Sequence, residues 1–466
     1  MARTKQTIQT IAFVSLGCPK NLVDSERMLG LLAEDGLVLT ADRQKADAVV
    51  INTCGFLEAS KTESMKEIHE AIELKRSGRC KRVVVAGCLV QRHKTELLAE
   101  APGIDRLVGV FDRERIVQAV RGIENPGQTD GHYLGKYHSL NRTGKFFEDD
   151  RARLRLTPRH YAYLRVSEGC NQGCAFCTIP SIRGPMRSKP VEHILTEARE
   201  LAADGAVELN LIGQDTTSYG TDIGYAGGLA GLLRTLDREL TDVRWLRLMY
   251  AYPSCFTDEM IRAIAESDNV VKYVDMPLQH INDEILTRMR RRVTRRQIEE
   301  LLDKLRTIAP GIAIRTTFIA GSPGETEEQH QELLNFIREF GFDMLGVFPY
   351  SPEPGTAMGR MEDQVMEETK TRRVEELMLA QQDVAFGKAR AMVGKTVTVL
   401  VDKFNDGTWV CRTTSQAPEI DSVTLVRGGK LHVGQMVEVR ITGSSGYDLI
   451  AAPARSAARS LTVVTA

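Results

Sequence analysis

The chain has 466 residues, of which 42% are hydrophobic and 26% charged, and its 61 Lys and Arg residues against 62 Asp and Glu residues give a net charge of −1. This composition excludes a largely disordered chain and supplies enough apolar residues for cores in about three domains. No apolar run approaches the ~18 residues that span a bilayer, and the balanced charge argues against a protein that coats nucleic acid through a broad basic surface.

The N-terminus resembles a secretion signal only superficially. Arg3 and Lys5 precede a short apolar run at residues 11–16, but this run is shorter than a usual signal core and continues into Pro19 and Lys20. Nine cysteines in a long chain also differ from the disulfide framework of a small secreted domain. We therefore expect a cytoplasmic protein without membrane contact, whose thiols bind metal.

Residues 10–121 alternate apolar strands with amphipathic segments of helical length. Strands are predicted at 11–14, 48–51 and 83–86. Fully apolar strands that alternate with helices are typical of a parallel sheet covered on both faces, so we expect a doubly wound α/β domain. Residues 122–155 lose this periodicity and gather Gly, Asn, Pro and Asp, which indicates a linker.

The alternation of strands and helices returns in residues 156–392. Strands are predicted at 161–167, 206–213, 244–250, 270–276, 312–320 and 343–348, and a long helix at 363–392. Six such units predict an open or partial (β/α) barrel with its chemistry at the carboxyl ends of the strands.

Residues 393–455 change to short strands with turn signals between them. Strands are predicted at 396–401, 408–412, 423–426, 436–442 and 448–451. Five short strands indicate a small antiparallel β-barrel of OB-like type. Residues 456–466 are expected to form a flexible tail, so the chain as a whole is predicted to be a multidomain α/β protein.

Three cysteines follow the first predicted strand of the central part at the spacing Cys170-x-x-x-Cys174-x-x-Cys177. Three thiolates on one loop can hold a four-iron cluster and leave one iron open to an outside ligand. The alternative is a zinc site, but structural zinc sites use four ligands, and no fourth Cys or His follows at hairpin spacing. We therefore predict a cluster with an open site, which indicates chemistry rather than electron storage.

Three further cysteines, Cys18, Cys54 and Cys88, each follow a predicted strand of residues 10–121. Any one of them could be a buried small hydrophobe. All three, however, fall at the carboxyl edge of one parallel sheet, where open α/β sheets bind their ligands. We interpret them as ligands of a second cluster that again lacks one thiolate. The remaining cysteines are treated as structural: Cys80, Cys255 and Cys411.

The spacing of Cys170, Cys174 and Cys177 after the first strand of a partial barrel resembles the radical S-adenosylmethionine signature. With the upstream three-cysteine domain and the terminal barrel, residues 10 to 452 resemble the methylthiotransferase family, which has an N-terminal methylthiotransferase domain, a radical domain and a TRAM domain. One branch, the MiaB type, modifies adenosine in transfer RNA, and the other, the RimO type, modifies an aspartate of the twelfth small-subunit ribosomal protein. The chain resembles the second branch in four segments: 15–26, 213–220, 250–254 and 275–281.

This resemblance implies two [4Fe-4S] clusters and S-adenosyl-L-methionine as both radical source and methyl donor. The cluster on Cys170, Cys174 and Cys177 would bind S-adenosylmethionine, and the resulting 5′-deoxyadenosyl radical would take hydrogen from the aspartate β-carbon, which side-chain acid–base catalysis cannot do. The second cluster would hold or deliver the sulfur and yield 3-methylthioaspartate. The implied partners are the ribosomal protein, free or on the ribosome, and an electron donor such as flavodoxin or ferredoxin.

The segment Gly321-Ser322-Pro323-Gly324-Glu325 follows a predicted strand, and its glycines would let the backbone approach a bound nucleoside. The alternative is a bare turn before a helix. Ser322 departs from the family, which usually has Phe there. Two other residues are expected on the active face, Asp215 and Gln279, so that Asp215, Gln279, Gly321, Gly324 and Glu325 are the candidate cofactor contacts.

The densest basic run spans Arg288 to Arg296 and is interpreted as a solvated face, with contact to ribosomal RNA or an acidic partner as the alternative. In the terminal barrel, six basic residues between 395 and 440 balance six acidic residues between 402 and 448, so the basic footprint of an RNA clamp is missing. This favours a protein substrate, although such barrels bind RNA often enough to keep transfer RNA as an alternative. A non-catalytic iron–sulfur or RNA-binding protein is the third hypothesis.

Overall fold

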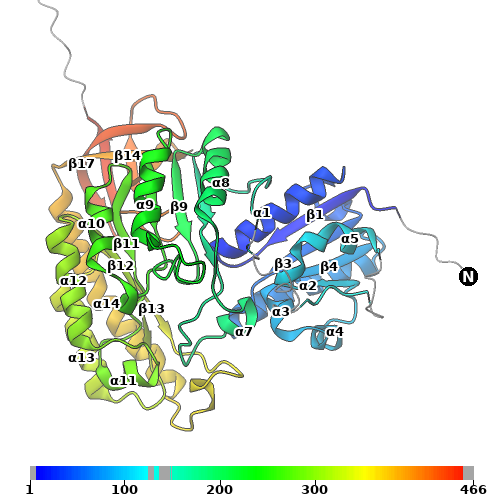
Figure 1. The fold of residues 1–466 in the computed structure, drawn as a ribbon, viewed down its shortest axis with the longest axis horizontal. Coiled ribbons are helices and arrows are strands. Elements are labelled where there is room, and N and C mark those ends of the chain that lie inside the picture. Colours follow the sequence, from blue (N-terminus) through cyan, green and yellow to red (C-terminus); the bar gives the residue numbers. More distant parts are fainter. Residues whose placement is uncertain (1–6, 124–130, 136–146, 148, 455–466) are drawn as a thin grey trace, which may run out of the picture.

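The computed structural model describes residues 7–123, 131–135, 147 and 149–454. Figure 1 shows an α/β unit formed by the N-terminal quarter of the chain, beside a larger central β/α unit, with the C-terminal barrel at one end of the central unit. The predicted tail at 456–466 and much of the predicted linker at 122–155 lie outside the described residues. Within the described residues, no helix is long and apolar enough to cross a membrane.

The N-terminal unit is a five-stranded parallel sheet in the order β2-β1-β3-β4-β5. Its strands are β1 (Thr10–Ser15), β2 (Val38–Leu39), β3 (Ala48–Thr53), β4 (Arg82–Gly87) and β5 (Arg106–Val108). The three apolar strands predicted from sequence are confirmed as β1, β3 and β4. The two edge strands β2 and β5 were missed because they are too short to show a pattern.

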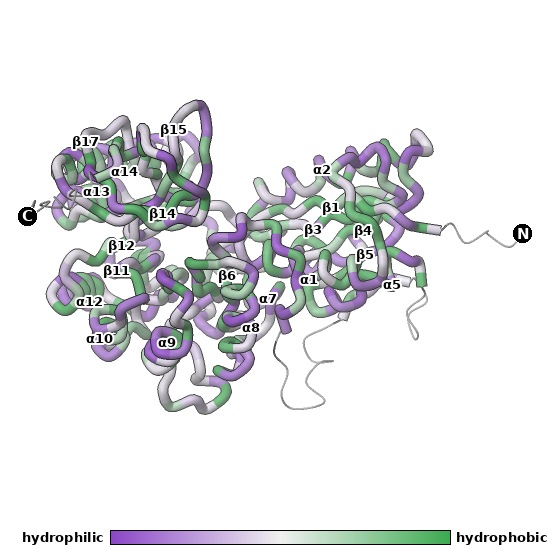
Figure 2. Tube along the Cα trace, turned by 90° about the horizontal axis from the view of Figure 1, so that it is seen from above, coloured by the Kyte–Doolittle hydropathy of each residue, from purple (hydrophilic) through white to green (hydrophobic). Residues whose placement is uncertain are grey.

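Helices cover both faces of this sheet, as expected for a doubly wound fold. One face carries α1 (Pro19–Glu34) and α5 (Ile116–Arg121); the other carries α2 (Glu58–Arg76), α3 (Cys88–His93) and α4 (Glu96–Glu100). Two 3₁₀ turns complete the unit, η1 (Arg43–Lys45) and η2 (Val110–Arg115). Successive residues of β4 alternate between the two cores, and Figure 2 shows a hydrophobic β4 and a largely hydrophilic α2.

The central unit is a six-stranded, all-parallel sheet in the order β13-β12-β11-β10-β9-β6. Its strands are β6 (Tyr161–Arg165), β9 (Glu208–Ile212), β10 (Trp245–Leu248), β11 (Val270–Asp275), β12 (Ala313–Ala320) and β13 (Met344–Pro349). Because the strands follow one another in chain order without closure, the sheet is the predicted partial barrel. A small hairpin of β7 (Ser167–Glu168) and β8 (Arg187–Ser188) stands beside β6.

Helices pack on the outer face of this barrel. They are α8 (Val191–Ala203), α9 (Gly228–Glu239), α10 (Asp258–Glu266), α11 (Asp283–Arg288), α12 (Arg295–Ile308), α13 (Glu327–Phe340) and α14 (Glu367–Met392), with α7 (Ile179–Arg183), η4 (Pro253–Cys255) and η5 (Met358–Arg360) in the loops. Capping boxes at Thr294 and Thr326 fix the starts of α12 and α13.

The C-terminal unit is a closed barrel in the order β14-β15-β16-β18-β17. Its strands are β14 (Thr396–Asn405), β15 (Thr408–Thr413), β16 (Thr424–Arg427), β17 (Met436–Ser445) and β18 (Asp448–Pro453). The predicted five strands and OB-like barrel are confirmed. The barrel is not wholly antiparallel, since β16 and β18 pair in parallel to close the Greek key.

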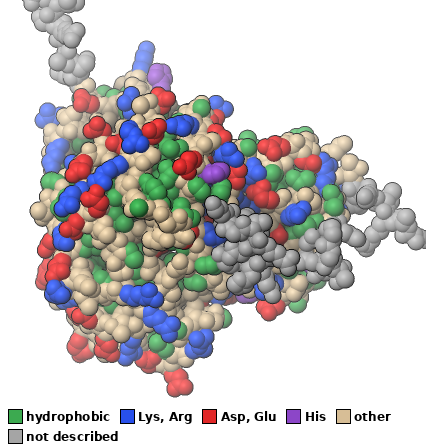
Figure 3. Space-filling model, viewed as in Figure 1, with side chains coloured by type: hydrophobic (Ala, Val, Ile, Leu, Met, Phe, Trp, Pro, Cys, Tyr) green, Lys and Arg blue, Asp and Glu red, His purple; other side chains and the backbone are tan. Residues whose placement is uncertain are grey.

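The C-terminal barrel also packs against the inner face of the central barrel. Leu400 packs into the same core as Tyr161 and Tyr273. The Tyr161 hydroxyl donates to Glu419 at 3.0 Å, and the Tyr273 hydroxyl donates to Asp421 at 2.9 Å. Acidic residues of the terminal barrel are therefore used in contacts with the central barrel. On the face shown in Figure 3, charges of both signs are interspersed.

Candidate active site

The first cysteine trio lies in the loop between β7 and α7. Burial, with a smaller contribution from the nearby thiol of Cys174, raises the pKa of Cys170 to about 11 and that of Cys177 to about 12. Backbone N–H groups of Gln172 and Ile179 point at Cys170 Sγ and Cys177 Sγ, at 3.5 and 3.4 Å. A thiol with a raised pKa becomes a thiolate when a metal binds it, and these donors suit the anionic form.

The second trio gathers at the carboxyl ends of β1, β3 and β4, which are neighbours in the sheet. Gly17, at φ +89°, is required because a Cβ there would lie 2.8 Å from Cys54 Cβ. Burial, with smaller contributions from the nearby thiols of Cys18 and Cys54, raises the pKa of Cys88 to about 12. The structure thus brings together three cysteines that are far apart in sequence, as the positions of their strands predicted.

The spread of the sulfurs decides between zinc and a larger centre. Tetrahedral zinc with Zn–S bonds of 2.3 Å would hold its sulfurs about 3.8 Å apart. In the described residues, neither trio has all three sulfurs within 4.8 Å of one another. An iron–sulfur cluster places its thiolates on separate irons and so takes a wider spacing, which fits these donor sets better than a single tetrahedral zinc ion does.

The two trios are joined by the short helix α7. It starts two residues after Cys177 and ends at Arg183, whose Nη2 donates to Cys88 Sγ at 3.0 Å. Figure 1 shows α7 beside α3, the helix that begins at Cys88. Helix α7 and Arg183 therefore connect the trio on the barrel with the trio on the N-terminal sheet across the interface between the two units.

A buried network of charges holds this interface. Arg183 pairs with Asp24 at 2.7 Å, and Arg165 pairs with Asp150 at 2.5 Å. Burial alone would raise the pKa of Asp24, but Arg165, Arg183 and Arg113 lower it to about 2. Because this is below the ordinary value of 3.8, the stabilisation is complete above that value and is lost as the pH falls through about 2.

Replacing Arg183 with methionine is expected to destabilise the metal-free chain by about 3–5 kcal/mol, because the carboxylates of Asp24 and Glu168 lose a buried partner. Urea denaturation measures the change. The matched control is Arg296→Met, which removes an exposed pair with Glu300 and should change stability by less than about 0.5 kcal/mol. Equal denaturation midpoints for the two variants would contradict the role given to the network.

Asp215, a predicted cofactor contact, lies beside the first trio. Its carboxylate accepts from Gln172 Nε2 and Ser218 Oγ, both at 2.6 Å, and from the backbone N–H of Thr217 at 3.0 Å. Gln172 belongs to the loop of the trio. The contacts of Asp215 therefore hold the cysteine loop in place.

Gln279, a second predicted contact, follows β11 with φ +75° and pairs its backbone with Thr317 and Ile319. Its Oε1 atom is buried and has no hydrogen-bond partner in the described part of the chain. A buried acceptor left unpaired is costly. The position is therefore suited to a group that a bound cofactor would supply.

In the turn at 321–325, the packing of neighbouring side chains leaves no room for a side chain at either glycine. A Cβ on Gly321 would lie 2.4 Å from Lys370 Cγ, and a Cβ on Gly324 would meet the Arg288–Asp363 ion pair. Atoms of other side chains therefore occupy the space that a Cβ at either glycine would need.

Two other residues of this turn, Ser322 and Glu325, are buried. Glu325 accepts from the N–H groups of Gly321 and Ser322 at 2.9 Å and pairs with Arg373 at 3.0 Å. Ser322, the departure from the family pattern, is fully buried, and its Oγ has no partner among the described residues.

Two buried cations at the site were missed from sequence. Lys20, two residues after Cys18, is 8% exposed and places its Nζ 3.1 Å from the centroid of the Tyr250 ring. Arg291 lies over Tyr252 and directs Nη1 at Cys174 Sγ, 3.5 Å away. Arg291 was hidden within the basic run, and Lys20 could have been found only as the charge nearest Cys18.

The rest of the basic run behaves as a solvated face. Arg288 pairs with Asp363 and Glu284, and Arg296 pairs with Glu300. Such exposed pairs contribute little to stability. Arg288 and Arg296 are therefore engaged in ion pairs with acidic residues close to them.

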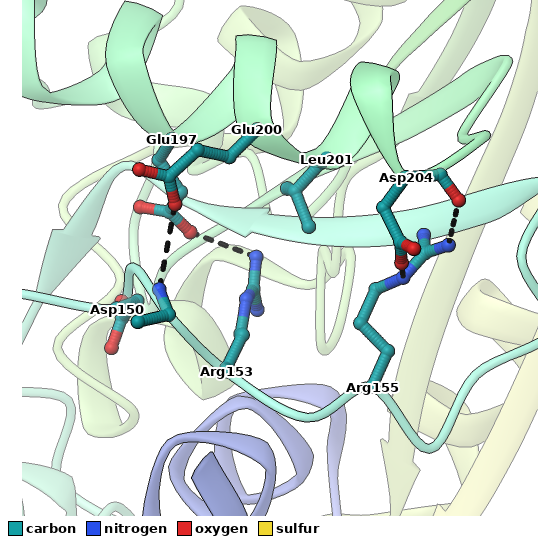
Figure 4. A pocket seen from close by; sticks show the side chains of 8 residues that line it. Asp150, Arg153, Arg155, Glu197, Glu200, Leu201 and Asp204 are labelled. Atoms are coloured by element: carbon teal, nitrogen blue, oxygen red, sulfur yellow. Dashed lines mark hydrogen bonds and ion pairs between the residues drawn. The ribbon is translucent and has the colours of Figure 1, made fainter. Parts of the chain in front are cut away.

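A polar cavity of about 90 Å³ lies away from both trios, between α8 and residues 150–155 (Figure 4). Its ionic side chains satisfy one another, because Arg153 pairs with Glu197 at 2.8 Å and Arg155 pairs with Asp204 at 2.7 Å. The cavity is thus a polar seam and not the reaction site.

Comparisons with known proteins cover the same three parts. Residues 10–109 match the uncharacterized protein family UPF0004, residues 164–337 match the radical SAM superfamily, and residues 393–453 match the TRAM domain. The radical SAM match includes the loop with Cys170, Cys174 and Cys177. Among solved structures, the radical S-adenosylmethionine methyltransferase TsrM from Kitasatospora setae shares the fold, with a TM-score of 0.55 at 14% identity over 86% of this chain and 79% of that one.

Curated relatives match nearly the whole chain. Proteins named ribosomal protein uS12 methylthiotransferase RimO are 43% identical in Geotalea uraniireducens and 44% identical in Geobacter sulfurreducens, each over 95% of this chain and 98% of the relative. The protein of that name from Bdellovibrio bacteriovorus is 44% identical over 94% of this chain and 96% of its own length. The chain therefore belongs to the RimO family of ribosomal protein uS12 methylthiotransferases, within the radical SAM superfamily.

Proposed function

We propose that this chain is a radical S-adenosylmethionine methylthiotransferase that modifies the β-carbon of an aspartate of ribosomal protein uS12. The observation that carries the proposal is the pair of cysteine trios, which are connected across the interface by α7 and Arg183. One trio supplies the radical and the other the sulfur, so a substrate residue has to lie between them. The curated relatives named for this activity support the same substrate.

The residues of both trios fit [4Fe-4S] clusters, with Cys170, Cys174 and Cys177 holding the first and Cys18, Cys54 and Cys88 the second. When bound, the clusters and S-adenosylmethionine supply the radical and sulfur chemistry that protein side chains lack. The chain supplies positioning: Arg291 balances the thiolate of Cys174, and Arg183 balances that of Cys88. Such donors to cluster sulfurs tune the potential of a cluster.

Among the predicted cofactor contacts, Gln279 has an unpaired buried Oε1 that can accept from an amino or hydroxyl group of S-adenosylmethionine. Asp215 acts through Gln172 on the cysteine loop. Gly321, Gly324 and Glu325 shape the turn beyond β12, which lies next to β11 and Gln279. We place these five residues along the cofactor's side of the site.

In this proposal, residues 10–121 hold the sulfur cluster, residues 156–392 hold the radical cluster, and residues 393–455 form the TRAM barrel. The protein would act in the cytoplasm, with an electron donor such as flavodoxin or ferredoxin. Modification of adenosine in transfer RNA has less support, since the relatives are named for a protein substrate.

The proposal is tested by mass spectrometry after anaerobic incubation of the reconstituted protein with reductant, S-adenosylmethionine and both candidate substrates, uS12 and unmodified transfer RNA. We expect a methylthio mass increase on one aspartate of uS12 and none on the RNA. The same increase on the RNA alone would contradict the assignment of substrate while leaving the clusters in place.

A further inference from the structure

Lys20 is a buried cation without a counter-charge. Its side chain lies where α1 meets the loop after β10, with Nζ over the Tyr250 ring and Cys18 two residues before it. In the part of the chain that the structure describes, no carboxylate lies within ion-pair distance of this ammonium group. An aromatic face only partly replaces the water that a buried ammonium loses, so the positive charge of Lys20 is not fully compensated.

The other buried cations of this region have a partner for their charge. Four arginines each pair with a carboxylate at 2.5–2.8 Å. These are Arg165, Arg183, Arg247 and Arg412. Arg291 has no carboxylate among the described residues, but it faces a cysteine sulfur. Lys20 is therefore distinguished by a positive charge for which the fold provides only an aromatic ring.

The ring that covers Lys20 is held in place at some cost. Tyr250 has φ +60°, a left-handed conformation that is unfavourable for a bulky residue. Its carbonyl accepts from the N–H of Thr216 at 3.1 Å, and the N–H of Ala251 donates to the Asp275 carbonyl at 2.8 Å. Backbone strain of this kind persists where function requires a fixed side chain. Tyr250 and Lys20 thus form one prepared element beside the sulfur trio.

We propose that the Lys20 ammonium binds the side-chain carboxylate of the substrate aspartate and thereby places the neighbouring β-carbon beside Cys18. This inference rests on the proposed function and adds the group that recognises the substrate residue. The carboxylate is bonded directly to the carbon that accepts sulfur, so holding the carboxylate fixes that carbon. A charged contact also favours aspartate over asparagine and over the uncharged base of a nucleotide.

The test measures binding of a uS12 peptide that contains the target aspartate and of the same peptide with asparagine, using the anaerobically reconstituted protein and fluorescence anisotropy. The unmodified chain is expected to prefer the aspartate peptide by about tenfold or more, as for a charge-assisted hydrogen bond. Lys20→Met and Lys20→Gln should both bind the two peptides equally. Lys20→Arg should keep part of the preference, and Lys45→Met, which removes an exposed lysine of the same unit, should keep all of it.

Persistence of the aspartate preference in both Lys20→Met and Lys20→Gln would overturn the inference, as would its absence from the unmodified chain. Measuring the iron and sulfide content of the Lys20 variants distinguishes substrate binding from an alternative role of Lys20 as a counter-charge for the second cluster. Loss of iron together with an unchanged aspartate preference would assign Lys20 that alternative role. Failure of the proposed function has a different signature, because uS12 would then stay unmodified by the unaltered chain, whatever the peptide preference.

Discussion

Simultaneous replacement of Cys170, Cys174 and Cys177 by alanine is expected to abolish reductive cleavage of S-adenosylmethionine. These thiols are the only cysteines of the radical SAM signature loop. Without them no cluster can form to carry the electron or bind the cofactor. Chromatography of 5′-deoxyadenosine after incubation with a strong reductant measures the loss, which should be complete.

The control for this variant is Cys80→Ala with Cys411→Ala, two buried cysteines outside both trios. It should cleave S-adenosylmethionine like the unmodified chain and hold the same amount of iron. Cleavage that survives in the signature-loop variant would show that the radical centre lies elsewhere.

Replacing Cys18, Cys54 and Cys88 by alanine is expected to have the opposite pattern, with cleavage of S-adenosylmethionine kept and methylthiolation of uS12 lost. The reason is structural separation. The second trio lies on the N-terminal sheet, and the contacts of the first trio to Gln172, Ile179 and Arg291 do not involve it. Arg183 would lose Cys88 but keep Asp24 and Glu168.

Iron content provides the quantitative readout for this second variant. If each trio holds a cluster of the same type, the bound iron should fall by about half. Methylthiolated product at the normal rate would rule out the second trio as the sulfur site, and an unchanged iron content would show that it holds no cluster.

Much of the fold could be predicted because its signals are strong and local. Fully apolar strands such as Val83–Val85 separate helices of regular length, and this pattern specifies parallel sheets wherever it occurs. The second trio could also be predicted, since strand ends in one parallel sheet necessarily meet at one edge. The parallel pairing of β16 with β18 could not, because strand order in a barrel depends on contacts far apart in the chain.

The side-chain contacts around the two cysteine trios could largely not be predicted from the sequence. Arg183 and Asp24 are 159 residues apart, and nothing local in either segment indicates their pairing. The glycines at 321 and 324 suggested space for a nucleoside, but the structure shows Lys370 and the Arg288–Asp363 pair against them. Lys20 lies in the segment 15–26, yet only its lack of an acidic partner in three dimensions distinguishes it.

The most direct measurement follows deuterium from the substrate. uS12 carrying aspartate deuterated at the β-carbon is incubated anaerobically with the reconstituted chain, reductant and S-adenosylmethionine, and the 5′-deoxyadenosine formed is analysed by mass spectrometry. The account predicts deuterium in the 5′-deoxyadenosine and a methylthio group on the same aspartate. Methylthiolated uS12 formed with deuterium-free 5′-deoxyadenosine would contradict it.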